Sequence, residues 1–461
     1  MLRQLHIKNF KAWRDTGPLR FAPLTVLFGA NSSGKSSINQ FLMMLKQTVL
    51  SADRNSVLDF GGAHDAVQLG SFREAVFGHD SELSMEVHTQ WDLPSVMTVR
   101  DPRTTKRYFG DRLIFDASVR QSPRSRVVQS EGFSYILESS DGVSLSVSMG
   151  RDERRTDRWR LEAEGYDLVR NPGRPWELPK PVQFHGFPQE ATLYYQNSLF
   201  LADLEVSLEN LLRDISYLGP LRIRPERLYV WSGGAPVDVG WQGENTIQAI
   251  LAAGERRLNW VEKARRKSLQ RVVAEWLVRM RLVDSFSVVP IAEDRDEYEV
   301  RVKTSQRSPE VKLTDIGFGV GQVLPVLTQA FYAPARSTVL MEQPEIHLHP
   351  SVQAELADLL IAAVNAREEG APREVQLIVE SHSEHLLRRL LRRIAEEKID
   401  ESDVALYFCS ASNTGSAMER LDVDSYGDIR NWPPEFFGDE LEDVSVQARR
   451  AMQRRNERTD T

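Results

Sequence analysis

The chain has 461 residues, of which 41% are hydrophobic and 27% charged, a composition typical of globular proteins with more than one core. Its formal net charge of −8 argues against a nucleic-acid-binding surface over the whole molecule. The single cysteine, Cys409, excludes an internal disulfide and a CxxC metal site. There is no apolar signal segment and no run near the roughly 20 apolar residues that span a bilayer. We therefore expect a cytoplasmic protein without membrane contact.

The amino-terminal part predicts the start of an α/β unit. Residues 2–9 alternate as a strand does, and residues 24–28 form a short buried-strand pattern that leads into glycine. A helix is expected from about residue 36 to 49 because its apolar side chains recur at helical spacing. From residue 81 to 202, short alternating segments broken by Gly, Pro, Asp and Ser predict an antiparallel, β-rich insertion.

The second half predicts helices and then a β-α-β alternation. Helical periodicity returns at residues 203–216 and 256–283. Beyond residue 310, three apolar runs alternate with helical stretches, which favours a largely parallel sheet. These runs are residues 338–341, 375–379 and 404–409. The expected units are a head formed by residues 1–80 and 203–420, the insertion at 81–202, and a carboxyl-terminal tail module at 421–461.

A glycine-rich loop follows the strand predicted at 24–28. Residues 29–36 are Gly-Ala-Asn-Ser-Ser-Gly-Lys-Ser, which fits GxxxxGK[ST] between a strand and a helix. Glycines let the backbone wrap around a phosphate, and the free N–H groups of a helix amino end favour the anion. Lys35 supplies positive charge for the β- and γ-phosphates, and the Ser36 hydroxyl suits magnesium. The loop therefore predicts binding of ATP and Mg²⁺ through Asn31, Ser32, Ser33, Gly34, Lys35, Ser36 and Ser37.

A second motif begins with an apolar strand that ends in acids. Residues 342–350, Glu-Gln-Pro-Glu-Ile-His-Leu-His-Pro, resemble the DEPE-x-HLHP segment of RecF/OLD-like ABC ATPases. The resemblance implies that Glu342 organises Mg²⁺ and that the residue at position 343 polarises the attacking water. Here that residue is Gln343, which can orient a water but cannot accept a proton at neutral pH. Either Glu345 supplies the base, or hydrolysis is slow and the protein is a long-lived clamp held by ATP.

Residues 313–325 resemble the signature motif of ABC ATPases, which binds the nucleotide held by the partner subunit. A polar turn leads there into an apolar helix, whose amino end could reach a γ-phosphate. Relatives usually have serine where Gly317 or Gly321 stands, and the alternative is an ordinary glycine-rich helix start. The candidate nucleotide contacts of this motif are Gly317, Gly319, Gly321 and Gln322.

Three further residues are candidates for the same site. His382 follows the strand pattern of residues 376–380 and matches the switch histidine of the family, which implies a hydrogen bond to the γ-phosphate. The alternative is an ordinary loop histidine. Lys11 lies in a segment that resembles the NFKSF turn near the nucleotide, and it is either a phosphate contact or a surface lysine. Gln68 is a candidate for the Q-loop glutamine beside magnesium.

The chain as a whole resembles bacterial ABC-type AAA family ATPases of the SMC/RecF/OLD-like group, over residues 1–80 and 210–440. The match includes a tail with the sequence Trp432-Pro-Pro-Glu-Phe-Phe437. The resemblance implies an α/β fold, an ABC-type P-loop ATPase head with a mixed, largely parallel sheet and flanking helices, together with the β-rich insertion. It also places His347 and His349 where two protomers pack, which argues against a metal pair.

Function follows from the resemblance in three alternatives. The first is an ATP-dependent homodimer, or a higher oligomer, that controls an effector such as a nuclease in phage defence or DNA repair. DNA contact would use two basic clusters, although such clusters are usually solvated faces. The second is an ABC ATPase unrelated to nucleic acid, and the third is a scaffold that binds ATP without turnover. The clusters are Arg256, Arg257, Lys263, Arg265, Arg266, Lys267 and Arg271, and Arg388, Arg389, Arg392 and Arg393.

Overall fold

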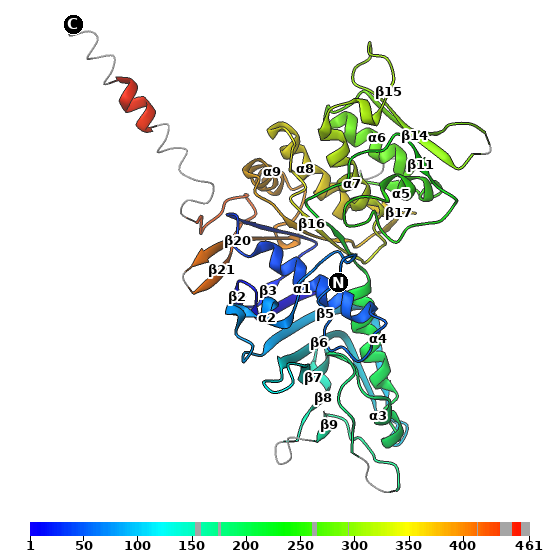
Figure 1. Ribbon diagram of the computed structural model, residues 1–461, viewed down its shortest axis with the longest axis vertical. Helices are drawn as coiled ribbons and strands as arrows, with labels where there is room; N and C mark the ends of the chain where they lie inside the picture. The colour runs from blue at the N-terminus through cyan, green and yellow to red at the C-terminus, as the bar shows by residue number, and fades with distance from the viewer. Residues whose placement is uncertain are drawn as a thin grey trace.

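Two large sheets enclose one long helix. A computed structural model describes residues 1–152, 158–173, 177–260, 265–293, 295–412, 414–433 and 445–452. Figure 1 shows helix α1 (Lys35–Leu50) between a mixed sheet and a long antiparallel sheet. Within the described residues, no helix is both long and apolar enough to cross a membrane.

The mixed sheet has six strands in the order β10-β16-β19-β4-β20-β21. The first five run parallel and only β21 is antiparallel to its neighbour. Strands buried on both faces are almost entirely apolar, as is usual for parallel sheets. This arrangement confirms the predicted α/β class and the largely parallel sheet. The strands are β4 (Leu24–Gly29), β10 (Ile215–Leu218), β16 (Thr338–Glu342), β19 (Gln376–Glu380), β20 (Val404–Ser412) and β21 (Gly415–Arg420).

Alternate residues of the mixed sheet enter two different cores. In β19, Leu377 and Val379 pack in the core with the carboxyl-terminal helices, whereas Ile378 packs in the core that contains α1. Because successive strand residues point to opposite faces, the apolar run needs helices on both sides. The helices that pack in the core with Leu377 and Val379 are α5 (Thr246–Ala252), α6 (Leu269–Arg279), α7 (Phe318–Tyr332), α8 (Pro350–Val364) and α9 (Glu384–Ala395).

The predicted β-rich insertion continues a sheet that begins at the amino terminus. Strand β1 (Leu2–Phe10) pairs with β5 (Met85–Arg100), with Lys8 opposite Glu86. A meander then follows through β6 (Arg107–Gln121), β7 (Val128–Ser139), β8 (Gly142–Arg151) and β9 (Trp159–Glu164), while β2 (Trp13–Asp15) and β3 (Leu19–Arg20) pair with β1. The expected boundary at residues 80/81 therefore runs through one sheet.

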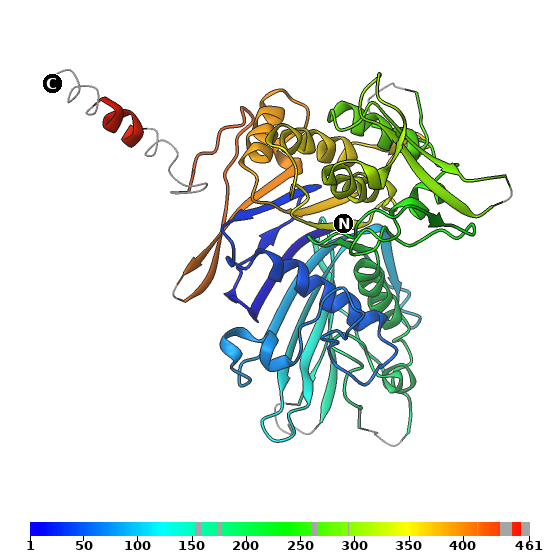
Figure 2. The same ribbon diagram turned by 45° about the horizontal axis from the view of Figure 1, so that its top comes forward.

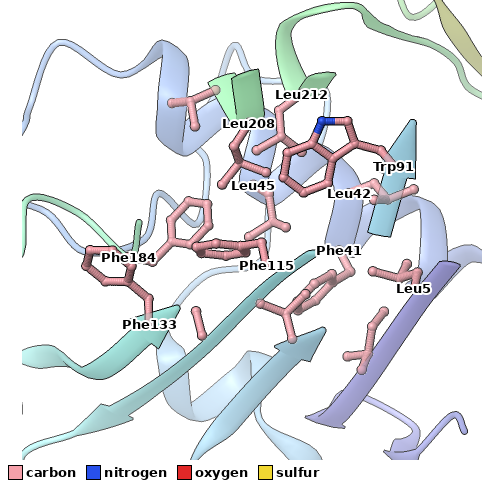
Figure 3. Close-up of a cluster of buried hydrophobic side chains, with 14 of the residues drawn as sticks. Leu5, Phe41, Leu42, Leu45, Trp91, Phe115, Phe133, Phe184, Leu208 and Leu212 are labelled. Carbon is pink, nitrogen blue, oxygen red and sulfur yellow. The ribbon is translucent and has the colours of Figure 1, made fainter. Parts of the chain in front are cut away.

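One apolar core joins this antiparallel sheet to α1 and to helix α4 (Phe200–Arg213). Figure 3 shows Phe41, Leu42 and Leu45 of α1 among strand and α4 side chains, which include Phe115 and Leu208. Burying these side chains stabilises the contact by about 1.5–3 kcal/mol each. The meander and the phosphate-loop helix therefore share a core, and Figure 2 shows the strands leading down from α1.

The helices of the middle segment differ from the predicted ones. The helix predicted at 203–216 ends at Arg213 because strand β10 begins at Ile215. In the described part of residues 256–283, the helix is α6, preceded by β12 (Leu258–Asn259). Leu258 and Lys267 exchange two backbone hydrogen bonds of 2.8 Å, which form an antiparallel bridge between these two residues.

Short elements complete the chain. They are α2 (Phe72–Ala75), η1 (Phe77–His79), α3 (Gln189–Tyr194), β11 (Tyr229–Val230), the β13 (Ser285–Pro290) and β14 (Glu297–Lys303) hairpin, β15 (Val311–Lys312), η2 (Leu313–Asp315), β17 (Arg367–Glu368), β18 (Ala371–Pro372) and η3 (Glu401–Asp403). In the tail, the Asp422 N–H donates to the side chain of Asn431. Residues 434–437 of the Trp-Pro-Pro-Glu-Phe-Phe motif lie outside the described residues.

Candidate nucleotide-binding site

The candidate site lies at the carboxyl edge of the parallel strands. Strand β4 ends in Gly29, β16 ends in Glu342 and β19 ends in Glu380. Glu342 pairs in register with Glu380, and Glu380 pairs with Leu27 of β4. Ligands of open parallel sheets bind outside the carboxyl ends of the strands. The topology thus brings residues about 300 positions apart in the sequence to one edge.

Two glycines of the phosphate loop cannot be replaced without displacing a neighbour. Gly29 has φ of 142°, and a Cβ there would lie 2.1 Å from the carbonyl oxygen of Cys409 in β20. Gly34 has φ of 88°, and its carbonyl accepts a hydrogen bond of 2.9 Å from the Trp13 indole. The loop is therefore held between the mixed sheet and strand β2.

The side chains of the loop divide into an inner and an outer set. Lys35 is 3% exposed, and its ammonium donates to the carbonyls of Gly29 at 3.0 Å and Ala30 at 2.7 Å. Burial lowers the Lys35 pKa, which the nearby Glu380 opposes. Ser33 and Ser37 are also buried, whereas Asn31 and Ser32 are exposed on the outside of the loop.

Glu342 is a buried acid among other acids. Burial and, after it, the neighbouring Glu380 raise its pKa from 4.5 to about 7, while hydrogen bonds from Tyr217 and Asn39 oppose the change. The Asn39 amide lies 3.5 Å from Glu342 Oε1. Two carboxyl groups so close together cannot both ionise readily without a cation.

Glu380 is a site residue that the motif analysis did not select. Burial raises its pKa, which a hydrogen bond from Ser36 and the charge of Lys35 oppose. Its Oε2 atom is buried and has no hydrogen-bond partner. The sequence signal is the one that identified Glu342, an acid that ends a wholly apolar strand.

Glu345 and His382 connect this edge to the phosphate loop. Glu345 is 6% exposed, and its Oε1 accepts a 2.6 Å hydrogen bond from the backbone N–H of His382. Burial raises the Glu345 pKa. The pKa of His382 is lowered by burial and by Lys35, and its ring hydrogen-bonds the backbone of Gly29. The predicted histidine therefore lies between the loop and the acid.

Gln343 and Lys11 also lie at this edge. Gln343 has φ of 44°, and its N–H donates to the carbonyl of Glu380 at 2.8 Å. Lys11 lies in the turn between β1 and β2, where its ammonium donates to Gln40 of α1 at 2.6 Å. Burial lowers the Lys11 pKa and the charge of Glu342 opposes that effect, so the ammonium lies near Glu342.

Gln68 does not join the site. It is exposed, and its amide donates to the carbonyl of Ala63 at 3.2 Å. The neighbouring Val67 is bonded to Gln47, which is about 17 Å along α1 from Ser36 at 1.5 Å per residue. The expectation that Gln68 lies beside magnesium is therefore not met, because the loop packs on the far end of the helix.

The predicted signature segment forms the start of α7. Gly317 caps the helix in an exposed position, and neither it nor Gly319 has atoms that a Cβ would displace. Gly321 packs inward, because a Cβ there would lie 2.7 Å from Pro225. Gln322 is 2% exposed, so only Gly317 and Gly319 of the four candidates are open to a partner.

The histidines after β16 are not arranged as a metal site. His349 caps α8, where its Nδ1 lies 3.3 Å from the Ser351 N–H, and the His347 carbonyl lies beside the start of α7. Within the described residues, no group of three or more His, Cys, Asp or Glu side chains could hold a metal. The oxygen donors Ser36, Glu342 and Glu380 fit Mg²⁺, which in phosphate sites uses one or two carboxylates together with the phosphates.

Arg222, which follows β10, is a second residue that the motif analysis did not select. It is 8% exposed, and its Nη2 donates to the backbone carbonyl of Glu342 at 3.2 Å. Burial lowers its pKa to about 10, and Glu345 opposes the change. A buried arginine one strand away from Glu342 places a fixed positive charge beside the acids.

Comparison with known proteins agrees with this geometry. Residues 1–90 and 263–387 match the family model described as an AAA ATPase domain. They contain the phosphate loop, Glu342, Glu380 and His382, whereas Arg222 lies outside them. Residues 399–447 match a second model, described as a protein of unknown function (DUF3696).

The solved structures that the chain matches include SMC head domains. An Smc head bound to the C-winged helix domain of ScpA is 13% identical, with 92% of this chain and 98% of that chain covered and a TM-score of 0.45. The SMC head domain from Thermotoga maritima is 12% identical, with 92% and 99% covered and a TM-score of 0.40. No curated protein matches the chain.

The two basic clusters are largely neutralised by acids of the same chain. In α9, Arg388 pairs with Glu384 and Arg392 with Glu396. Exposed pairs of this kind are worth little energetically, but they reduce the positive charge available to phosphate. Lys263 lies outside the described residues. The other pairs are Arg389 with Glu355, Arg393 with Asp358, Arg256 with Glu368, Arg266 with Glu369, and Lys267 and Arg271 with Glu275.

Proposed function

We propose that this protein is an ABC-type ATPase that binds ATP and Mg²⁺, dimerises around the nucleotide and thereby controls an effector. The supporting observation is the meeting of the phosphate loop, Glu342, Glu380 and His382 at one sheet edge. This combination provides phosphate binding, oxygen donors for a cation and a histidine beside the loop in one place.

Each group has a role in this proposal. The loop amides and Lys35 bind the β- and γ-phosphates, and His382 hydrogen-bonds the terminal phosphate. Ser36, Glu342 and Glu380 hold Mg²⁺, which when bound neutralises phosphate charge. Lys11 adds positive charge near the acids. The bound cation would favour the ionised form of the carboxyl groups whose pKa is raised.

The water-activating residue follows from the contrast between two side chains. Glu345 is buried, is held by the His382 N–H and can accept a proton, whereas Gln343 can only orient a water. We propose Glu345 as the general base. The second candidate function is a slow or silent ATP-held clamp, which the amide of Gln343 favours.

Dimerisation would place the start of α7 against the phosphate loop of the partner. The exposed Gly317 and the unobstructed Gly319 leave the helix amino end accessible to a γ-phosphate. The resemblance to SMC/RecF/OLD-like ATPases suggests a nuclease as the effector, in phage defence or DNA maintenance. Direct DNA binding is the weaker alternative because acids neutralise the two basic clusters.

The experiment measures ATP turnover of the full chain and, by light scattering, its oligomeric state. The light scattering is done with ATP, with a non-hydrolysable analogue and without nucleotide. We expect magnesium-dependent turnover and a nucleotide-dependent dimer. Gly319→Arg should bind ATP with wild-type affinity but should fail to dimerise, while Gly234→Arg, at a glycine with open space around it, serves as the control. Equal dimerisation of Gly319→Arg and wild type would contradict the proposed interface.

A further inference from the structure

Arg222 has more hydrogen-bond donors than partners. Only Nη2 is bonded, to the Glu342 carbonyl, while Nε and Nη1 are buried without a partner. An unsatisfied buried donor costs about 1–3 kcal/mol, and more when it is charged. Unsatisfied buried donors are rare in native proteins, and a partner in another state of the site would explain this one.

The matching acceptor is Glu345. Its Oε2 atom is also buried and without a partner, and the carboxylate is 6% exposed. Arg222 and Glu345 interact electrostatically, and the structure describes no hydrogen bond between them. A guanidinium can bind a carboxylate through two parallel N–H groups, so pairing of the two side chains would satisfy both groups at once.

The segment that carries Arg222 also contacts the start of α7. We call residues 219–227 the linking segment. Its Pro225 lies against Gly321 of α7, and Arg227 forms a 3.0 Å ion pair with Asp315 just before that helix. A displacement of α7 therefore reaches Arg222 through a few residues of backbone.

We propose that Arg222 is a positioning residue that holds the Glu345 carboxylate for hydrolysis, and that the linking segment couples it to contacts made at the start of α7. The inference rests on the proposed function, because it presumes that this site hydrolyses ATP. A partner that presses on α7 would close the Arg222–Glu345 pair, so that turnover follows dimerisation.

The test compares kcat and ATP affinity of wild type, Arg222→Gln, Arg222→Lys and Glu345→Gln. We expect Arg222→Gln to lower kcat by about 10- to 100-fold with the Kd for ATP within twofold, because misplacing a group by about 1 Å costs up to 100-fold. Arg222→Lys should recover part of the rate. The double variant Arg222→Gln/Glu345→Gln should be no slower than Glu345→Gln alone, since both act on one step.

The linking segment and its contact with α7 also provide a control variant and a variant that should disturb the coupling. Arg224→Gln, exposed and two residues away, should leave kcat unchanged. Gly321→Ala pushes on Pro225 and should lower kcat without loss of ATP-dependent dimerisation. If Arg222→Gln does not fold, Arg222→Lys takes its place in the test. A lower kcat of Arg222→Lys at unchanged melting temperature then supports the inference, and an unchanged kcat overturns it.

Two results separate the inference from the function on which it rests. A wild-type protein without turnover overturns both. Wild-type turnover with unchanged kcat in the Arg222 variants, additive losses in the double variant, or an unaffected Gly321→Ala overturns the inference alone.

Discussion

The raised pKa of Glu342 predicts that removing this acid stabilises the nucleotide-free protein. Its pKa rises from 4.5 to about 7 on folding, so the folded protein holds a proton that the unfolded chain loses above pH 4.5. The free energy of unfolding therefore falls as pH increases from about 4.5 to 7 and stays reduced above. The Glu342→Gln substitution removes this loss of folding stability.

The size of the effect follows from the proton affinity. At about 1.4 kcal/mol per tenfold change, the rise in pKa corresponds to about 3 kcal/mol at pH 8. Because Glu342 is 6% exposed, solvent screening does not reduce this figure much. The melting temperature should increase by on the order of 5 °C at pH 8 and should not change at pH 4.5.

The assay is thermal unfolding of both proteins from pH 4.5 to 8, without nucleotide and again with ATP and Mg²⁺. With ligand the order should reverse, because the variant has lost a proposed cation donor and gains less from binding. Glu82→Gln, at an exposed site, is the control. A melting temperature for Glu342→Gln that is lower than wild type at pH 8 without nucleotide would refute the electrostatic reasoning.

Three other substitutions test separate parts of the site. Lys35→Ala should weaken ATP binding by at least about 10-fold in calorimetry, because a charge-assisted contact contributes about 1.5–3 kcal/mol, and wild-type affinity would contradict the assignment. Gly29→Ala should lower the melting temperature by several degrees, since its Cβ would meet the Cys409 carbonyl at 2.1 Å and the backbone strain adds about 1–3 kcal/mol. Gln343→Glu should accelerate turnover strongly if the protein is a clamp, whereas loss of turnover in Glu345→Ala identifies the base.

Local patterns predicted the elements that carry their own signal. The strand at 24–28, the loop at 29–36 and the helix after it follow from apolar spacing and glycine, and the structure has them as β4 and α1. The parallel sheet followed from three apolar runs. The same local reasoning located Glu342, which ends β16, and His382, which follows β19.

Long-range pairing was beyond such patterns. Nothing in residues 85–100 indicates that this strand pairs with β1, so the meander was expected as a separate insertion. Gln68 was chosen by a motif letter, although its loop packs on the far end of α1. Glu380 and Arg222 carry no motif letter, and only the strand order brings them beside Glu342.

The central claim, that each site combines the phosphate loop of one protomer with α7 of the other, is tested most directly by mixing two inactive variants. Lys35→Ala has a defective phosphate loop and an intact α7. Gly319→Arg has an intact phosphate loop and a blocked α7. A face-to-face pair of unlike protomers contains one intact composite site, so the mixture should recover up to about a quarter of wild-type turnover. Turnover in the mixture no higher than in the separate variants would contradict the account.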